Sequence, residues 1–334
     1  MSSVNWAGRK VLVTGAAGFI GSHLCEELAR QGASLRALVR YNSRGTYGWL
    51  EDAPLKLRRS MEIVQGDLRD PDTVDRLVRA CQYVFHLGAI ISIPYSYIAP
   101  TEVIQVNVVG THNILNACLR HGVQRLLHTS TSEVFGTAQY VPIDEEHPLQ
   151  AQSPYSASKI AADKLVESYW RSFNVPAVTV RPFNTYGPRQ SARAVIPTTI
   201  VQILAKQNPK LGSLTPTRDF TYVTDTVAGM IAAMNAPNVV GSNFNFGTGT
   251  EVAIADLIAL IGELIGTKPL VDRDPSRVRP EKSEVERLLS DNTRARELLK
   301  WQPQISLKEG LRSTIAWFES HMDLYRRALE EYVV

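Results

Sequence analysis

Cysteine is scarce in this chain: only Cys25, Cys81 and Cys118 occur among its 334 residues. Their spacing is not typical of a metal site, and an odd number of thiols does not make a disulfide framework. Each lies in an apolar or helical pattern, so we expect buried free thiols in a reducing compartment. The sequence therefore predicts neither a metal site nor a disulfide staple.

Long apolar runs are also lacking. No run approaches about 18 residues, the length expected of a membrane-spanning helix. The first residues lead directly into a strand pattern, without the apolar segment and cleavage site of a secretory signal. Together with the free thiols, these absences predict a cytoplasmic protein with no membrane partner.

A charge excess of one sign is missing as well. The 36 basic and 33 acidic side chains leave a formal net charge of +3. Proteins that bind nucleic acid or membrane surfaces usually show a clustered basic excess, so we predict neither partner. A small polyanionic ligand needs only a few local arginines, and the composition leaves that class open.

What the sequence does contain is a regular alternation of strand and helix patterns. Hydrophobic residues make up 44% of the chain, enough for a sizeable core. The predicted strands cover residues 10–14, 34–39, 62–65, 83–87, 125–129 and 177–181, and the predicted helices cover residues 19–31, 70–80, 101–121 and 156–173. Such alternation indicates an α/β fold, a Rossmann-like, doubly wound parallel sheet.

This regularity ends near residue 181, where prolines begin to interrupt short segments. We predict a strand–helix pair over residues 220–234, a helix over 251–265, and a charged surface loop over 272–290 that caps a cleft. The expected division is a dinucleotide-binding Rossmann domain of residues 1–181 plus about 219–246. A smaller, interleaved C-terminal substrate-binding region then takes about 182–218 plus 247–334.

Three glycines mark the turn between the first strand and the first helix. Gly15 permits a tight turn, Gly18 lets the backbone approach a pyrophosphate, and Gly21 lets the helix pack close to the sheet. The amide groups and dipole of the helix N-terminus then meet the negative charge. Within a strand–helix–strand unit, this pattern predicts a bound dinucleotide rather than an ordinary glycine turn.

The end of the second strand bears on which dinucleotide binds. An acid is usual there for NAD, whereas an arginine suits the 2′-phosphate of NADP. Here the strand ends at Arg40, and no carboxylate follows until Glu51. We favour NADP, with NAD as the alternative; the competing interpretation of Arg40 is a solvated surface arginine. Asp67 is placed either to accept from the adenine amino group or to cap the following helix.

Tyr155 and Lys159 are four residues apart, so both reach one side of a predicted helix. Tyrosine has a pKa near 10 in water, but a neighbouring ammonium and a positive nicotinamide ring favour the phenolate. The strand before this helix ends in Thr131, Ser132 and Glu133. Ligands of open α/β sheets bind at that edge. The combination predicts a proton-transfer site.

These motifs resemble the extended short-chain dehydrogenase/reductase superfamily over nearly the whole chain. They are the Gly-x-x-Gly-x-x-Gly turn, residues 86–89 (His-Leu-Gly-Ala), the Thr-Ser-Glu strand end, Tyr-x-x-x-Lys, residues 181–188 (Arg-Pro-Phe-Asn-Thr-Tyr-Gly-Pro) and residues 218–225 (Arg-Asp-Phe-Thr-Tyr-Val-Thr-Asp). The resemblance implies that Thr131, Tyr155 and Lys159 form the catalytic set.

The resemblance also implies the binding residues. For the cofactor they are Gly15, Gly18, Phe19, Ile20, Gly21, Arg40, Asn42, Ser43, Arg44, Asp67, Leu68, Leu87, Ala89, Asn107, Tyr155 and Lys159. For the nucleotide-sugar substrate they are Asn184, Val195, Arg218 and Arg287, with Arg193 and Arg279 as further candidates. Guanidinium groups suit phosphate because they donate forked hydrogen bonds.

More narrowly, the chain is similar to nucleotide-sugar 4,6-dehydratases, especially those of the legionaminic-acid type, through residues 39–44, 188–197 and 211–218. The implied reaction converts a UDP- or GDP-linked (N-acetyl)hexose to its 4-keto-6-deoxy form, and the cofactor is retained tightly. Glu133 would remove the C5 hydrogen, and Glu133, or Ser132 through solvent, would assist the loss of water from C6.

One residue departs from that pattern, because many 4,6-dehydratases have Thr-Asp-Glu where this chain has Ser132. A 4-epimerase or a UDP-glucuronate decarboxylase on the same fold is therefore the alternative. Glu133 argues against a simple epimerase, which needs no base at C5, although a structural carboxylate is its other interpretation. A non-catalytic dinucleotide-binding scaffold is the alternative from another class.

The resemblance implies a homodimer as well, formed by the helices over residues 101–121 and 156–173. Val103, Val106, Ile114 and Leu115 are candidates for an apolar stripe between the two copies. Apolar residues at helical spacing more often face the protein's own core.

Overall fold

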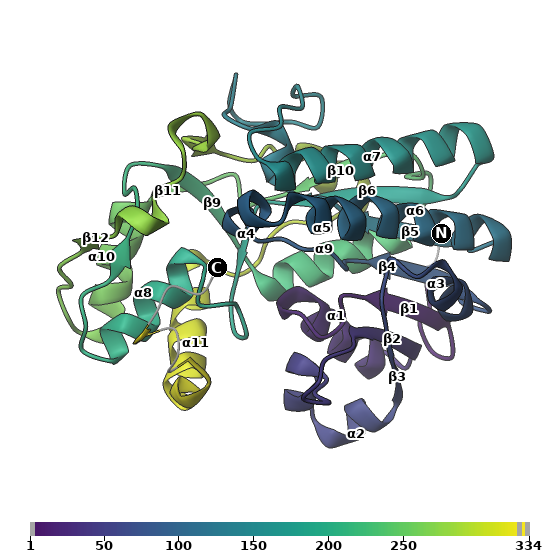
Figure 1. Cartoon of the computed structure of the whole chain (residues 1–334), viewed down its shortest axis with the longest axis horizontal. Helices are drawn as coiled ribbons and strands as arrows, with labels where there is room; N and C mark the ends of the chain where they lie inside the picture. The colour runs from purple at the N-terminus through teal and green to yellow at the C-terminus, as the bar shows by residue number, and fades with distance from the viewer. Residues whose placement is uncertain (1–3, 326–328, 331–334) are drawn as a thin grey trace.

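A seven-stranded parallel sheet forms the larger part of the molecule (Figure 1). The computed structural model describes residues 4–325 and 329–330. The strand order is β10-β6-β5-β4-β1-β2-β3, with β1 Lys10–Thr14, β2 Ser34–Arg40, β3 Met61–Gly66, β4 Tyr83–His86, β5 Arg125–Thr129, β6 Ala177–Pro182 and β10 Asn243–Phe246. The order reverses between β1 and β4, where a doubly wound sheet binds its ligand. The predicted fold class is confirmed.

Helices cover both faces of this sheet, because successive strand residues point to opposite sides. Val11 and Val13 pack in one buried cluster with α1 (Phe19–Arg30) and α9 (Val223–Asn235), whereas Leu12 packs in the other. That second layer contains α3 (Pro71–Val78), α6 (Gly110–His121) and α7 (Pro154–Phe173). The strands read as apolar runs because both faces are buried.

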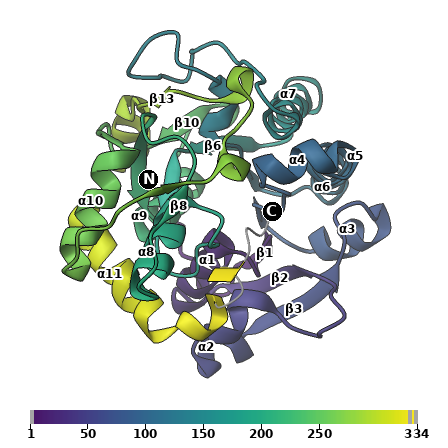
Figure 2. The same cartoon turned by 60° about the vertical axis from the view of Figure 1, so that its left-hand side comes forward.

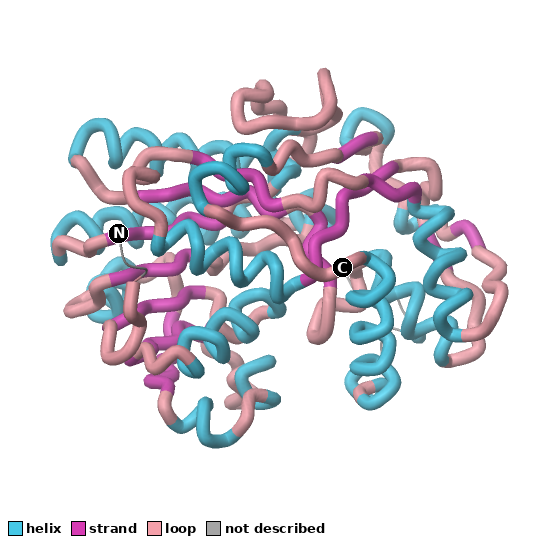
Figure 3. Tube along the Cα trace, turned by 180° about the vertical axis from the view of Figure 1, so that it is seen from behind, coloured by secondary structure: helices cyan, strands magenta, loops and turns pink. Residues whose placement is uncertain are grey.

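A smaller part is built on a four-stranded sheet and three helices, at the left of Figure 1 and turned forward in Figure 2. The sheet has β9 (Thr217–Tyr222) between β11 (Glu251–Ala253) and β13 (Arg287–Leu288), and β7 (Asn184–Tyr186) also pairs with β9. The helices are α8 (Val195–Leu204), α10 (Ile254–Ile265) and α11 (Leu307–Ser320), which share one apolar cluster. Figure 3 shows this helix-rich part beside the strand-rich body.

Short elements connect these layers. They are η1 (Gly48–Asp52), α2 (Leu55–Arg59), α4 (Ile93–Ile98), α5 (Pro100–Ile104), η2 (Gln105–Val109), η3 (Ser132–Phe135), η4 (Pro275–Arg277), η5 (Glu281–Ser283), η6 (Ala295–Leu299) and η7 (Met322–Tyr325), and β8 (Lys210–Leu211) pairs with β12 (Asp272–Arg273). Within the described residues, no helix is both long and apolar enough to cross a membrane.

Two predicted helices differ from the structure. The helix predicted over residues 101–121 contains a π-helical turn, η2, which separates α5 from α6. Such single-turn π segments are rare inside helices, so an apolar period over 21 residues is read by default as one continuous α-helix. The helix predicted from residue 251 begins only at Ile254, since Glu251–Ala253 pairs with β9. The predicted loop over 272–290 contains β12 and β13.

Segments after residue 181 contribute to both sheets. β9 pairs in the smaller sheet, whereas α9 and β10 pack on the large one. Cys25, Cys81 and Cys118 are buried and free, as the sequence predicts. Val103, Ile114 and Leu115 are fully buried. The suggested dimer stripe is therefore wrong for these three, because they belong to the core of the same chain.

We predict that Gly21→Ala destabilises the turn at the start of α1, because an added Cβ would overlap the carbonyl group of Gly15. The expected loss is about 1 to 3 kcal/mol in the free energy of unfolding, typical of overpacking, with weakened dinucleotide binding. Gly122→Ala is the control, because its left-handed backbone has open space around it. That variant should lose about 1 kcal/mol and bind normally. Equal effects in thermal unfolding and binding assays would contradict the prediction.

Candidate active site

The glycine turn has the geometry that a pyrophosphate requires. Gly15 has φ +71°, and an added Cβ would press on the backbone of Leu87 and Gly88. The Gly18 N–H donates to the Gly15 carbonyl oxygen at 3.0 Å. No side chain caps α1, and its first intrahelical bond runs from Ser22 to Gly18. The amides of the first helical turn, including those of Phe19 and Ile20, are thus available to an anion.

The segment after β4 forms the neighbouring wall of this site. The Gly88 N–H donates to Thr14 Oγ1 at 2.9 Å, so the backbone between Leu87 and Ala89 lies against the end of β1. Asn107 fixes the next residue, since its amide exchanges two hydrogen bonds with the Ile90 backbone, at 2.8 and 2.9 Å. Asn107 also donates to Ser158 Oγ at 2.9 Å. Asn107 therefore connects this wall to α7.

Arg40 and the loop that follows it lie at the end of β2. The Arg40 side chain is 71% exposed, and its nearest acidic atom is Glu102 Oε1 at 3.5 Å. Asn42 Oδ1 accepts from the Arg44 and Thr46 backbone amides, both at 3.2 Å, which shapes the loop. Ser43 and Arg44 are exposed on this loop. Arg40 therefore has unused donors for an anionic ligand.

Asp67 lies near Arg40, at the end of the neighbouring strand, but its carboxylate is already engaged. Arg69 donates to it from Nε at 3.0 Å and from Nη2 at 2.5 Å. This hydrogen bond, opposed by partial burial, lowers the pKa of Asp67. An adenine amino group would have to share that carboxylate, and the proposed adenine contact stays a prediction. Leu68 packs behind it, against Gly88.

Thr131, Tyr155 and Lys159 come together at the sheet edge. Thr131 caps η3 and hydrogen-bonds Tyr155, and both Tyr155 and Lys159 are buried on α7. Lys159 Nζ donates to the Thr129 carbonyl oxygen at 2.7 Å. Burial lowers the pKa of Lys159 to about 8, against the opposing charge of Asp163.

The surroundings of Tyr155 oppose its ionisation. Burial raises the pKa of Tyr155, and the hydrogen bond from Thr131 offsets only part of this increase. The adjacent carboxylate of Glu133 raises it further. Desolvation of the phenolate is the largest cause of this increase, and the expected joint effect of the ammonium and a positive nicotinamide ring stays a prediction. A positive charge beside the ring would be needed to favour the phenolate.

The buried carboxylate of Asp163 joins the elements around Tyr155 and Lys159. Asp163 accepts from His128 Nε2 at 3.1 Å, from Ser130 Oγ at 2.9 Å and from Arg181 Nη2 at 3.2 Å. Burial opposes its ionisation, but the His128 hydrogen bond and the Arg181 charge hold the pKa of Asp163 below its ordinary value. Asp163 lies one helical turn after Lys159, so it connects α7 to β5 and β6.

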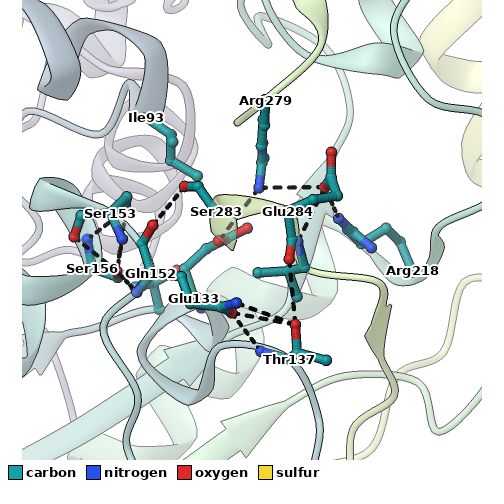
Figure 4. A network of polar contacts seen from close by, with 12 residues as sticks. Ile93, Glu133, Thr137, Gln152, Ser153, Ser156, Arg218, Arg279, Ser283 and Glu284 are labelled. Atoms are coloured by element: carbon teal, nitrogen blue, oxygen red, sulfur yellow. Dashed lines mark hydrogen bonds and ion pairs between the residues drawn. The ribbon is translucent and has the colours of Figure 1, made fainter. Parts of the chain in front are cut away.

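Glu133 lies under a charged segment from the C-terminal part, shown in Figure 4. Arg279 Nη1 is 3.7 Å from Glu133 Oε2 and 3.9 Å from Glu284 Oε1. Arg218 Nη2 is 3.5 Å from the same Glu284 oxygen. These pairs lack hydrogen-bond geometry, and Arg279 Nη1 is a buried atom without a hydrogen-bond partner. The two guanidinium groups therefore have donors to spare for an anion.

The other predicted substrate residues are distributed around this cluster. Asn184 pairs with Phe220 across β7 and β9, and its Oδ1 is buried without a hydrogen-bond partner. Val195 begins α8, which has no side-chain cap. Arg287 donates from Nε to both Glu251 oxygens, at 3.0 and 2.9 Å, so its charge is already paired. Arg193 is exposed and bonded to Ser191.

Two acidic residues of this site, Asp163 and Glu284, were not identified from the sequence. The signal for Asp163 was its position four residues after Lys159, on the same helical face. Nothing in the local pattern of Glu284 distinguishes it from other surface acids. Among the described residues, no three His, Cys, Asp or Glu side chains are grouped to hold a metal ion.

We predict that Asp163→Asn lowers the free energy of unfolding by about 3 to 5 kcal/mol at neutral pH, because Arg181 would stay buried without its partner. Ser130→Ala, the control, removes one hydrogen bond to the same carboxylate and should cost about 1 kcal/mol. A folded-state pKa below the ordinary value stabilises the protein above that value. The difference from wild type should therefore diminish as the pH falls through the folded-state pKa. Denaturant unfolding across pH measures it, and equal losses in both variants would contradict the prediction.

Comparisons with known proteins agree with this architecture. Residues 12–314 match the family model described as GDP-mannose 4,6 dehydratase. The chain is 34% identical to UDP-glucose 4-epimerase of Mycolicibacterium smegmatis, over 93% of this chain and 99% of that protein. It is 30% identical to dTDP-D-glucose 4,6-dehydratase of Mus musculus, over 98% and 94%.

Among solved structures, a double mutant of the dTDP-glucose 4,6-dehydratase DesIV from Streptomyces venezuelae, with NAD bound, has a TM-score of 0.83. That match has 26% identity and covers 94% of this chain and 98% of the other. Epimerases and dehydratases thus occur together among the relatives, and the specific reaction differs between them. The chain belongs to the GDP-mannose 4,6-dehydratase family, within the extended short-chain dehydrogenase/reductase superfamily of NAD-dependent nucleotide-sugar dehydratases and epimerases.

Proposed function

We propose that this protein is a nucleotide-sugar 4,6-dehydratase that converts a UDP- or GDP-linked (N-acetyl)hexose to its 4-keto-6-deoxy form. The observation that carries the proposal is the carboxylate of Glu133, which follows Thr131 in η3 and acts electrostatically on Tyr155. A 4-epimerase needs no base at C5, whereas dehydration does. The relatives include both activities, so the site residues have to decide between them.

Each catalytic residue has one part in the proposed mechanism. Tyr155 takes the proton of the C4 hydroxyl while Thr131 orients that oxygen. Lys159 supplies a buried positive charge beneath the reacting groups, and Glu133 removes the C5 hydrogen that the 4-ketone has made acidic. A nicotinamide dinucleotide held on the glycine turn of Gly15, Gly18 and Gly21 would supply hydride transfer between C4 and C6. Its positive ring would supply the charge that favours the Tyr155 phenolate. Water leaves C6 between these steps.

Tight retention of the cofactor follows from this mechanism, and a homodimer follows from the resemblance to the superfamily. Because the hydride returns to the product, the cofactor is regenerated in place and is expected to be tightly retained. We also propose a homodimer through α5, η2, α6 and α7, where the exposed apolar side chains include Ile104, Val109 and Phe173. The three buried free thiols support a cytoplasmic location.

NADP is the proposed cofactor, and Arg40 is the residue that supports it. Its exposed guanidinium at the end of β2 makes one long hydrogen bond, to Glu102 at 3.5 Å, and a 2′-phosphate would complete its hydrogen bonding. The sequence offers no acid at this position for a ribose hydroxyl. NAD, which is bound in the DesIV structure, is the alternative.

We predict that Arg40→Ala weakens NADP binding by about 10- to 100-fold, the equivalent of one lost charged hydrogen bond of about 1.5 to 3 kcal/mol, and leaves NAD binding unchanged. Arg59→Ala changes an exposed arginine in α2, near the other end of β3 from Arg40; it is the control and should alter neither affinity. Fluorescence titration of cofactor-free protein with both dinucleotides provides the measurement. A wild-type protein that prefers NAD, or an equal effect on both cofactors, would contradict the assignment.

The reaction itself is tested by mass spectrometry on UDP- and GDP-linked N-acetylhexosamines and hexoses. The expected product is lighter than its substrate by one water molecule, and Tyr155→Phe should lower its rate by roughly 100- to 10,000-fold. Tyr169→Phe on the same helix is the matched control, because within the described part of the chain the Tyr169 hydroxyl bonds only Asn116. An unchanged mass with an inverted C4 would identify an epimerase. Loss of carbon dioxide from UDP-glucuronate would identify a decarboxylase.

A further inference from the structure

Two sets of contacts join the glycine turn and α1 to the smaller part of the molecule. One set runs from α1 to residues 188–194, called here the connecting segment, which leads from β7 into α8. The other set runs from η1 to α11 and η7. α8 begins at Val195, a predicted substrate residue, so the first set lies between the two proposed ligand sites. None of these contacts takes part in the proposed catalysis.

Arg189 carries the first set of contacts. Its side chain is only 9% exposed and forms an ion pair with Glu26 of α1, with 2.6 Å between Arg189 Nη1 and Glu26 Oε1. The same nitrogen donates to Ser22 Oγ at 3.3 Å. Arg189 has φ +70°, a backbone conformation that is unfavourable for a residue with a Cβ. Residues keep such a conformation where the surrounding contacts impose it, and here those contacts include Glu26 and Ser22.

The residues of α1 that meet the connecting segment are close to the glycine turn. Ser22 closes the first helical turn, because its backbone amide donates to the Gly18 carbonyl oxygen at 2.9 Å. His23 Nε2 donates to the Pro188 carbonyl oxygen at 3.1 Å, and its ring packs edge-on against Phe19, with 6.0 Å between the ring centroids. Burial lowers the pKa of His23 to about 4, so the ring is neutral near pH 7. A movement of the connecting segment would therefore disturb the start of α1.

Trp49 carries the second set of contacts. Its backbone amide donates to the Ala17 carbonyl oxygen, inside the glycine turn, at 3.1 Å. Its ring packs against Trp317 and Tyr325, with centroid distances of 5.5 and 6.4 Å. The Tyr325 hydroxyl donates to the Gln190 carbonyl oxygen at 3.1 Å. Gln190 belongs to the connecting segment, so the two sets of contacts meet there.

Contacts of this kind give two ligands a physical reason to favour each other's binding. The proposed substrate would contact Tyr155 on the side of the large sheet and Val195 on the smaller part, so it favours the arrangement in which both parts are together. The contacts of the glycine turn are complete only in that arrangement. A partial separation would leave the charges of Arg189 and Glu26 buried and unpaired, which is costly. Two ligands that favour one state raise each other's affinity.

We propose that Arg189 is a positioning residue that couples the dinucleotide site to the nucleotide-sugar site through Glu26. The inference rests on the proposed cofactor and substrate class, and it applies to a dehydratase and to an epimerase alike. The coupling is reciprocal: the nucleotide of the substrate slows the loss of the dinucleotide, and the dinucleotide tightens the binding of the nucleotide. It would hold the cofactor in place during the interval in which the sugar is a 4-ketone.

The experiment measures the exchange of dinucleotide from the protein loaded with it. Bound NADP or NAD is exchanged for the isotope-labelled compound, with and without saturating UDP or GDP. In wild type, the nucleotide should slow this exchange by about 5- to 150-fold, the usual range for coupled sites. Arg189→Met and Glu26→Gln should each reduce the effect to roughly 2-fold or less, and the double variant should lose no more, because all three remove one contact. Calorimetry should still show UDP or GDP binding in each variant.

Arg30→Ala is the matched control, because Arg30 pairs with Glu27 within the same helix, on an exposed surface, and it should show the coupling of wild type. Glu26→Gln keeps the shape of the side chain, so it tests the pair even if Arg189→Met is unstable.

Undiminished coupling in Arg189→Met or in Glu26→Gln would overturn the assignment. Loss of UDP and GDP binding in these variants would overturn it too, because it would show a direct contact with the ligand. If UDP and GDP leave exchange unchanged in wild type, the inference fails and the proposed function stands. If wild type binds neither a dinucleotide nor a nucleotide, the proposed function fails and this inference with it.

Discussion

The buried carboxylate of Asp163 is the interaction on which the catalytic geometry depends. It joins α7, which carries Tyr155 and Lys159, to Ser130 at the end of β5 and to Arg181 on β6. A buried charge is tolerated only when it is paired and hydrogen-bonded. The partners of Asp163 therefore set the position of the helix relative to the strand end, and that position brings Tyr155 within hydrogen-bond reach of Thr131.

Desolvation also leaves the ionisable groups of the site only partly compensated by their neighbours. Burial raises the pKa of Tyr155 and lowers the pKa of Lys159, so both groups favour their neutral forms more than they would in water. Arg218 and Arg279 lie close to carboxylates without hydrogen-bonding them. Such an arrangement responds strongly to added charge, because the interior screens it weakly. A positive nicotinamide and a negative diphosphate are charges of the kind that would complete it.

The two parts of the chain contribute different residues to the site, which agrees with the family relationship. The large sheet carries the glycine turn and the Thr131, Tyr155 and Lys159 set, which the superfamily resemblance predicts. The smaller part carries Arg218, Arg279 and Glu284, and it approaches Glu133 from a different region of the sequence. Because epimerases and dehydratases share the fold, the reaction must be argued from these site residues rather than from the fold.

The sequence by itself determined the fold class, the glycine turn and the Tyr155–Lys159 pair, because each depends on residues close together in the chain. Apolar periods locate strands and helices, and a spacing of four places two side chains on one helical face. Tertiary structure decided the rest. The engagement of Arg287 by Glu251 and the convergence of Glu133 and Glu284 on Arg279 depend on contacts between distant segments. Local patterns do not contain such contacts, since packing and burial are properties of the whole chain.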